Sequence, residues 1–503
     1  MPRMQTRAKT RTLAELGLTA KNASELRITG LSVDSREVEE GHLFAALPGT
    51  RVHGAEFIQY ALRMKAAAIL TDREGAALAK DVLDGSDATL VVAEDPRETL
   101  AFTAALWFEA QPEVQVAVTG TNGKTSVASF TRQLWTEMGA PAVSIGTTGI
   151  EGAFTAPLMH TTPEPITLHR ALARIADEGI THAAMEASSH GLAQRRVDGV
   201  RLRAAGFTNL SQDHLDYHAD FEDYFAAKAG LFDRVLPEDG TAVINIDDPW
   251  GPRMADVADA RGQDVLTIGR DNRAALQILG QRFDATGQEL RFEWSGRIHQ
   301  VRMGLIGGFQ AENALMAAGL CIATGADAAE TFDTMHALET VRGRMQFAAR
   351  RENGATVFVD YAHTPEALVT ALKAVRPHVI GRLVVVFGAG GDRDRGKRPL
   401  MGRAAADHAD LVFVTDDNPR SEDPEVIRKE VLAGARQGAA EVTEVGDRAE
   451  AILRAVDALG PGDTLLVAGK GHETGQTVGD LVLPFDDVEQ SSIAVAALDG
   501  KGL

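Results

Sequence analysis

The most restrictive feature of the sequence is the repeated alternation of a short apolar run with a helix-length segment. In the middle of the chain the apolar runs are VQVAVTG, HAAMEAS, AAGFTNL, TAVINID and VLTIG. Toward the C-terminus they are ATVFVDYA, RLVVVFGAG, LVFVTDDNP and DTLLVAGKG. This alternation is typical of mostly parallel sheets with helices on their faces. Because ligands in such folds bind in loops at the carboxyl ends of the strands, these loops are the first place to look for chemistry.

The segment TGTNGKTS, residues 119–126, follows the run VQVAV and opens a helix-length segment. Its glycines let backbone N–H groups turn toward a phosphate, its lysine supplies a positive charge, and its threonine hydroxyl suits Mg²⁺. A general phosphate loop would have a glycine at the position of Val118, so this loop is a shorter variant and argues against a GTPase or motor ATPase. We therefore predict an ATP-binding loop made by Gly120, Thr121, Asn122, Gly123, Lys124, Thr125 and Ser126.

A chain of 503 residues is too long for one core. The predicted fold class is α/β, with a small N-terminal α/β domain, a central P-loop ATPase-like doubly wound domain and a C-terminal Rossmann-like domain. The pattern places these three domains at residues 1–111, 112–342 and 343–503.

Composition narrows the partners and the compartment. The net charge of −20 argues against nucleic acid, which selects basic surfaces. No apolar run is long enough for a membrane span, and the basic first residues lack the apolar stretch of a signal peptide. A single cysteine, Cys321, cannot form an internal disulfide. We expect a cytoplasmic protein without membrane insertion.

Ionisable residues gather after the next strands. Glu186 ends the run HAAME, and a carboxylate at that place beside a phosphate loop can hold Mg²⁺. The segment TNLSQDHLDYH contains Asp213, His214, Asp216 and His218. Lys228 follows among apolar residues in YFAAKAGLF, where a lysine could also extend its amine to solvent.

Taken together and in this order, GTNGKT, EASSH, DHLDYH, the YFAAK lysine and DYAHTP resemble the Mur ligases. The resemblance runs from about Val33 to Glu473, which is nearly the whole chain. It implies an ATP-dependent ligase that joins a carboxylate to an amine through an acyl phosphate, in peptidoglycan precursor synthesis. No enzyme nucleophile is needed for this chemistry. The expected substrates are ATP and a UDP-muramoyl dipeptide, the expected metal is Mg²⁺, and a monomer is expected.

The resemblance also assigns residues. Lys228 matches a carbamylated lysine that holds a metal, together with Thr125, Glu186 and His214. The matches for the UDP-linked substrate are Val33, Ser35, Thr50, Arg51, Val52, Thr161, Thr162, Ser188, Gln194 and Arg196. The matches for the ATP base and ribose are Asn313, Arg344 and Asp360.

The last loops bear on the amino acid that is added. Arg420 in DDNPR is a planar two-pronged donor suited to a carboxylate, and a lysine-adding relative would have no second carboxylate to bind. The loop therefore resembles the meso-diaminopimelate pattern, which implies a site made by Arg393, Asp417, Asn418, Pro419, Arg420, Gly469 and Glu473.

Two other classes stay open at this point. One is a different ligase of the same superfamily, such as a folylpolyglutamate synthase, and DNPR with GKGHE argues against it. The other is a P-loop protein that hydrolyses ATP without ligation, and DHLDYH with Lys228 argues against that.

Overall fold

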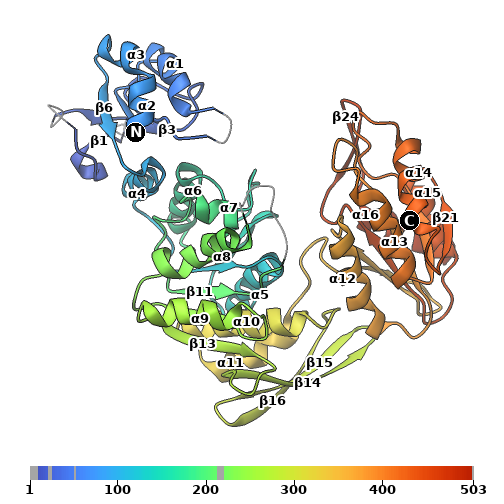
Figure 1. The fold of residues 1–503 in the computed structure, drawn as a ribbon. Coiled ribbons are helices and arrows are strands. Elements are labelled where there is room, and N and C mark those ends of the chain that lie inside the picture. The colour runs from blue at the N-terminus through green and yellow to red at the C-terminus, as the bar shows by residue number, and fades with distance from the viewer. Residues whose placement is uncertain (1–8, 21–24, 50–51, 212–219, 501–503) are drawn as a thin grey trace, which may run out of the picture. The chain divides into compact units, whose positions relative to one another are not determined.

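The computed structural model describes residues 9–20, 25–49, 52–211 and 220–500 (Figure 1). These residues form two compact units. The first comprises residues 1–124, 139–267 and 320–325, and the second comprises 125–138, 268–319 and 326–503. Among the described residues, no helix combines the length and apolar composition that crossing a bilayer requires.

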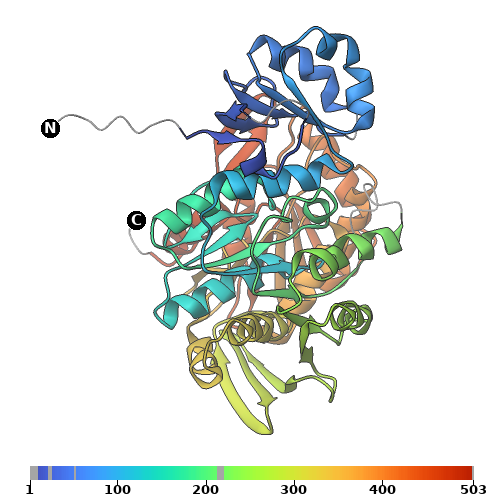
Figure 2. The same cartoon turned by 90° about the vertical axis from the view of Figure 1, so that its left-hand side faces the viewer.

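The first unit begins with a small parallel sheet in the order β3-β4-β5-β6, drawn in blue in Figures 1 and 2. One face packs on Ile58 and Ala61 of α1, and the other packs on Leu100 and Trp107 of α4. Helix α4 begins where the Asp95 carboxylate accepts backbone N–H bonds ahead of a proline, a favoured helix start. The elements are β1 (Arg11–Thr12), β2 (Arg27–Ile28), β3 (Gly30–Ser32), β4 (His42–Ala45), β5 (Ala68–Thr71), β6 (Thr89–Val92), α1 (Ile58–Arg63), α2 (Arg73–Leu78), α3 (Lys80–Asp84) and α4 (Pro96–Phe108).

The rest of the first unit is a larger sheet with the order β12-β11-β7-β10-β8-β9, parallel except for β9. Its interior strands are buried on both faces, as parallel strands covered by helices usually are. The elements are β7 (Val114–Thr119), β8 (Ala142–Gly146), β9 (Gly149–Gly152), β10 (His182–Glu186), β11 (Ala204–Phe207), β12 (Thr241–Asn245), β13 (Asp264–Gly269), α6 (Pro165–Asp177), α7 (Ser189–Ala193), α8 (Phe221–Gly230) and α9 (Gly251–Ala260).

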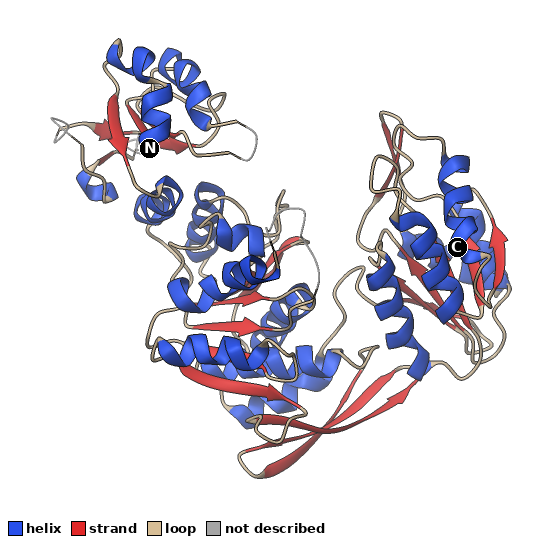
Figure 3. Cartoon of the chain, viewed as in Figure 1, coloured by secondary structure: helices blue, strands red, loops and turns tan. Residues whose placement is uncertain are grey.

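The second unit starts with a feature absent from the strands predicted above, an antiparallel meander of three long strands (Figure 3). Along its middle strand, Gly287–Trp294, the fully buried Leu290 and Phe292 alternate with more exposed residues. The elements are α5 (Lys124–Glu137), β14 (Leu276–Asp284), β15 (Gly287–Trp294), β16 (Arg297–Met303), α10 (Gln310–Ala323) and α11 (Ala328–Thr334).

The C-terminal sheet has the order β17-β18-β22-β19-β20-β21, and only β17 is antiparallel. Successive residues of β18 point to opposite faces: Phe358 joins the core with α12, α13 and α14, whereas Val357 and Val359 join the core with α15 and α16. The elements are β17 (Gln346–Arg350), β18 (Thr356–Asp360), β19 (Leu383–Phe387), β20 (Leu411–Val414), β21 (Glu441–Glu444), β22 (Thr464–Ala468), β23 (Gly475–Val478), β24 (Leu481–Pro484), α12 (Pro365–Val375), α13 (Lys397–His408), α14 (Pro424–Ala435), α15 (Arg448–Asp457) and α16 (Asp487–Leu498). The predicted α/β class is confirmed.

Candidate functional site

The phosphate loop joins the carboxyl end of β7 to α5, as the sequence predicts. Gly120 has a φ of 146°, and a Cβ there would lie 1.9 Å from the Thr208 hydroxyl, so only glycine fits. The Lys124 amine donates to the carbonyl oxygens of Gly120 at 3.0 Å and Thr121 at 2.8 Å. The lysine therefore lies folded over its own loop.

Residues after β11 hold the loop in shape. The Thr208 hydroxyl donates to the Asn122 carbonyl at 2.6 Å, the Asn122 N–H donates to the Asn209 side-chain oxygen at 2.9 Å, and the Thr121 N–H donates to the Asn209 carbonyl at 2.8 Å. Sequence reasoning assigned no role to Thr208 or Asn209. Both residues directly follow a strand that pairs with β7, and this position is the signal by which they could have been identified.

Lys228 lies on α8 with its side chain 1% exposed. Its amine donates to the Gly120 carbonyl at 2.7 Å and lies 4.5 Å from the centre of the Tyr224 ring. The alternative that this lysine extends to solvent is therefore wrong. The amines of Lys124 and Lys228 meet at one carbonyl oxygen of the loop.

Glu186 ends β10, and the register pairs it with Val118 of β7. Its carboxylate is buried and accepts a hydrogen bond from the Thr147 N–H at 2.7 Å. The carboxylate thus lies at the same sheet edge as the phosphate loop, where the sequence places it.

Five residues predicted to hold the UDP-linked substrate lie around the end of β10, where Glu186 is. The Thr162 hydroxyl donates to the Glu186 carbonyl at 2.9 Å and accepts from the Ser188 N–H at 3.0 Å. Arg196 donates to the Thr162 carbonyl at 2.7 Å and also to the Gln194 side-chain oxygen. The hydroxyls of Thr161 and Thr147 are 3.0 Å apart.

The predicted N-terminal substrate residues follow two neighbouring strands. Val33 and Ser35 come after β3, and Val52, which is 47% exposed, belongs to the segment after β4. Since β3 and β4 are parallel and paired, both segments leave the same edge of the small sheet. Thr50 and Arg51 lie outside the described residues.

The predicted metal ligands are only partly described. His214, with Asp213, Asp216 and His218, lies outside the described residues. Among the residues that the structure describes, no group of three or more His, Cys, Asp or Glu side chains could hold a metal. Glu186 and the loop hydroxyl of Thr125 are oxygen donors of the kind that Mg²⁺ prefers.

The predicted base and ribose residues lie in the second unit. Asn313 is buried on α10, where its amide donates to the Gln310 side chain at 3.0 Å. Asp360 ends β18 and accepts from the Met345 and Ala362 N–H groups at 2.8 Å each. Desolvation raises the pKa of the Asp360 carboxyl, against the lowering effect of the Arg344 charge and these two donors. The Arg344 guanidinium lies 5.0 Å from the Tyr361 ring centre.

The predicted amino-acid site forms at the carboxyl ends of the C-terminal strands. Asn418 donates from its amide to the Glu473 carboxylate at 2.9 Å. A Cβ on Gly469 would lie 2.7 Å from the Asp417 carboxylate, so glycine permits the loops after β20 and β22 to meet. Arg420 is partly buried and donates to the Gly391 carbonyl at 2.7 Å, which is inconsistent with a purely solvated charge.

Arg393 lies on the loop after β19 and is exposed. A Cβ on Gly390 would lie 2.9 Å from the Arg420 guanidinium and 3.8 Å from the Arg393 Cγ, so both arginines pass close to Gly390. The structure therefore brings Arg420, the predicted carboxylate-binding residue, and the aliphatic stem of Arg393 close to the same glycine.

Sequence reasoning missed Lys470, although it lies in the quoted GKGHE. Its amine is fully buried and donates to the Asn418 side-chain oxygen at 3.1 Å and to the Glu473 carboxylate at 3.0 Å. A buried cation normally needs such partners, so Lys470 holds Asn418 and Glu473 together.

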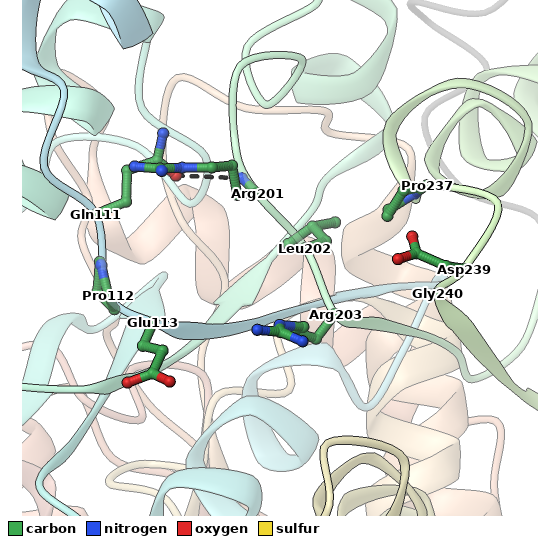
Figure 4. A pocket seen from close by; sticks show the side chains of 9 residues that line it. All are labelled: Gln111, Pro112, Glu113, Arg201, Leu202, Arg203, Pro237, Asp239 and Gly240. Carbon is green, nitrogen blue, oxygen red and sulfur yellow. Dashed lines mark hydrogen bonds between the residues drawn. The ribbon is translucent and has the colours of Figure 1, made fainter.

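A pocket of about 400 Å³ is lined by none of these residues, and Figure 4 shows its lining side chains. Its lining residues directly precede β7, β11 and β12, which places it at the amino ends of these strands. Ligands of parallel sheets bind at the carboxyl ends, so we do not assign it to the site. The lining residues are Gln111, Pro112, Glu113, Arg201, Leu202, Arg203, Pro237, Asp239 and Gly240.

Comparison with known proteins gave matches along most of the chain. Family models match residues 27–107 (Mur ligase family, catalytic domain), 118–321 (Mur ligase middle domain) and 343–471 (Mur ligase, glutamate ligase domain).

Two curated relatives are UDP-N-acetylmuramoyl-L-alanyl-D-glutamate–2,6-diaminopimelate ligases. The protein of Brucella melitensis biotype 1 is 49% identical, covering 94% of this chain and 95% of the relative. The protein of Bradyrhizobium diazoefficiens is 50% identical, covering 94% and 96%. A solved structure of a ligase with the same name is 34% identical with a TM-score of 0.73, covering 97% of this chain and 99% of the other.

Proposed function

Because this chain belongs to the Mur ligase family, we propose that it adds meso-2,6-diaminopimelate to UDP-N-acetylmuramoyl-L-alanyl-D-glutamate at the expense of ATP. The family and the three-domain α/β architecture predicted from the sequence are confirmed. One observation carries the substrate assignment. Over nearly its whole length, the chain is about half identical in sequence to ligases named for this reaction.

The chemistry at the phosphate loop follows from its charges. The substrate carboxylate attacks the γ-phosphate of ATP, and negative charge spreads over the transferring group. Lys124 is positioned to stabilise that charge once it leaves the Gly120 and Thr121 carbonyls for the phosphate oxygens. Once ADP has left, an amine of the added amino acid attacks the carbonyl carbon of the acyl phosphate and displaces inorganic phosphate. The new bond is an amide, and no protein nucleophile takes part.

The two amines at the Gly120 carbonyl are relevant to whether the Lys228 amine is carbamylated. Two cations that share one acceptor repel each other, and the Lys228 amine is buried away from screening water. Carbamylation of Lys228 would replace one of these cations with an anion. We propose this modification, with Thr125, Glu186 and His214 as the other ligands of Mg²⁺. When bound, Mg²⁺ would neutralise the charge on the phosphate oxygens.

The amino-acid site contains groups of both signs, as a substrate with two amines and two carboxylates requires. Arg393 and Arg420 offer planar donors to the distal carboxylate. Glu473 offers a carboxylate to the distal ammonium, and Lys470 with Asn418 holds it in place.

The proposal also covers location, oligomeric state and domain bounds. We propose a cytoplasmic monomer with domains at residues 1–111, 112–342 and 343–503. The substrates of this monomer are small molecules, and the residues predicted to contact the UDP group are Val33, Ser35 and Val52 in the described chain with Thr50 and Arg51.

The test is a coupled assay of phosphate release with ATP, the muramoyl dipeptide and one amino acid at a time. We expect release that depends on both the dipeptide and diaminopimelate. Lysine should be used on the order of 10⁴-fold less efficiently, as found for sites built to bind a group that the competitor lacks. Equal or preferential use of lysine would overturn the substrate assignment. Phosphate release without an amino acid would favour a plain ATPase.

A further inference from the structure

The two loops that carry Arg393 and Arg420 are held together by more than their own backbones. We call residues 388–396, after β19, the first arginine loop, and residues 415–423, after β20, the second arginine loop. The parent strands are neighbours in the sheet. The loops touch directly, because the Gly391 N–H donates to the Asn418 carbonyl at 2.9 Å and the Ser421 hydroxyl donates to the Asp392 carboxylate at 2.7 Å.

Both loops contain a strained residue. Asp392 and Arg420 each have a φ of 52°, in the left-handed region that side chains rarely adopt. Such a conformation persists only where the surroundings impose it. Something must therefore hold each loop against relaxation.

Arg398 on α13 provides a connection between the loops. Its guanidinium is fully buried and donates to the Glu422 carboxylate, with distances of 2.8 and 3.1 Å, and to the Gly390 carbonyl at 3.3 Å. Gly390 belongs to the first arginine loop and Glu422 to the second. Glu422 in turn accepts from the Asp392 N–H at 2.6 Å, next to Arg393.

This arrangement is costly if it serves stability alone. Removing the Arg398 charge from water costs free energy that its hydrogen-bond partners must offset, and a well-packed apolar side chain in its place is often as stable. The Arg398 Nε is moreover buried without a hydrogen-bond partner among the described residues. The hydrogen bonds that Arg398 and the Asp392 N–H donate hold the pKa of the Glu422 carboxyl at about 2, so the pair stays ionised.

We propose that Arg398 and Glu422 form a positioning pair that sets the separation of Arg393 and Arg420, so that both reach the same distal carboxylate of the amino acid. This inference rests on the proposed function. Neither Arg398 nor Glu422 touches the substrate. They determine selectivity because a fork of two arginines discriminates only when its two prongs are held at the spacing of one carboxylate.

Glu430 gives a matched control. It accepts from the same Arg398 guanidinium at 2.7 Å, but it lies on α14, outside both arginine loops. Glu422→Gln and Glu430→Gln therefore remove one carboxylate charge each from the same arginine. Only the first change weakens the link between the loops.

The experiment measures KM for diaminopimelate, ATP and the muramoyl dipeptide, the ratio of kcat/KM for diaminopimelate to that for lysine, and the melting temperature. For Glu422→Gln we expect a rise of about tenfold in KM for diaminopimelate and a similar fall in the ratio, the size of one charged hydrogen bond. The other two KM values should stay within about twofold. For Glu430→Gln we expect a lower melting temperature with all three KM values and the ratio unchanged.

Two outcomes would overturn the positioning role. One is a Glu422→Gln enzyme with normal KM and selectivity, and the other is an equal change in both variants. If Glu422→Gln does not fold, Arg398→Lys replaces it, since lysine keeps the charge but cannot reach Glu422 and Gly390 with one planar group. A wild-type enzyme that does not use diaminopimelate would instead contradict the proposed function, so the two failures are distinguishable.

Discussion

The phosphate loop of the first unit and the amino-acid site of the second unit hold their charged groups by different means. In the phosphate loop, the lysine amines donate to backbone carbonyls, and the loop is kept in shape by bonds from Thr208 and Asn209. In the predicted amino-acid site, the Lys470 amine donates to the Glu473 carboxylate of its own loop and to the Asn418 side-chain oxygen of the neighbouring loop, and Arg398 donates to the Glu422 carboxylate.

The difference fits the ligand proposed for each site. A phosphate is the same group in every nucleotide, and backbone N–H groups with a flexible amine suffice to bind it. Choosing one amino acid over another requires side chains at fixed positions, because only a group left without its partner penalises the competitor.

The largest effect is expected at the phosphate loop. Lys124→Ala removes the charge that would meet the γ-phosphate, and the rate of phosphate release should fall by about 10²–10³ or more. The control is Lys65→Ala, which removes an exposed lysine paired with Glu40. Near-normal turnover of a folded Lys124→Ala enzyme would show that the loop is not part of the catalytic site.

A second test concerns the buried amine. Lys228→Ala should lose activity by on the order of 10² or more, because the anionic carbamate proposed on Lys228 would be lost with the lysine. Added formate or acetate should restore part of the rate by supplying carboxylate oxygens. Turnover of Lys228→Ala equal to that of the parent would contradict both the carbamate and the metal assignment.

Substitutions in the proposed amino-acid site should change the KM for the amino acid. Arg420→Ala should raise KM for diaminopimelate by about 10–100-fold, the cost of one charged hydrogen bond, and leave KM for ATP nearly unchanged. Arg420→Lys should recover only part of the loss, because a point charge does not reproduce the fork. Arg403→Ala, which changes a half-exposed arginine on α13, is the control. An equal rise in KM for all substrates would show a general structural defect instead.

The smallest effect concerns stability. His169 on α6 is fully buried, and its ring nitrogens have no hydrogen-bond partner among the described residues. Burial, with a smaller contribution from Arg201, lowers the pKa of His169 to about 4. In the unfolded chain the imidazole takes up a proton near its ordinary pKa of about 6.5. The folded state is therefore favoured above that pH and loses stability as the pH falls toward 4.

Between about pH 7 and pH 5 the loss at His169 should be about 2 kcal/mol. His169→Phe should flatten the pH dependence of chemical denaturation over this range, whereas His336→Phe at an exposed position should not. A pH dependence that survives in His169→Phe would mean that other groups dominate. This buried and unpaired imidazole also sharpens the contrast with Lys470 and Arg398, whose buried charges have carboxylate partners.

The sequence by itself determined the α/β class, the phosphate loop and most of the predicted site positions, because each of these depends on short-range information. A strand, two glycines, a lysine and a helix at fixed spacing define the loop from Gly120 to Lys124. Residues after strands of a parallel sheet necessarily reach one edge, which places Glu186, Asp360 and Arg420 at strand ends. The antiparallel meander β14–β16 was missed, since its polar, partly exposed strands lack the continuous apolar runs of the other strands.

Only the tertiary structure decided which groups meet. Lys228 comes 108 residues after Gly120, and Lys470 comes 52 residues after Asn418. No local pattern distinguishes such a lysine from one that extends to solvent, because the deciding quantity is the burial of its amine. The same holds for Arg398, whose partners on two different loops are brought together only by the pairing of β19 with β20. Local spacing encodes backbone conformation, whereas charge pairing across loops depends on the packing of the whole sheet.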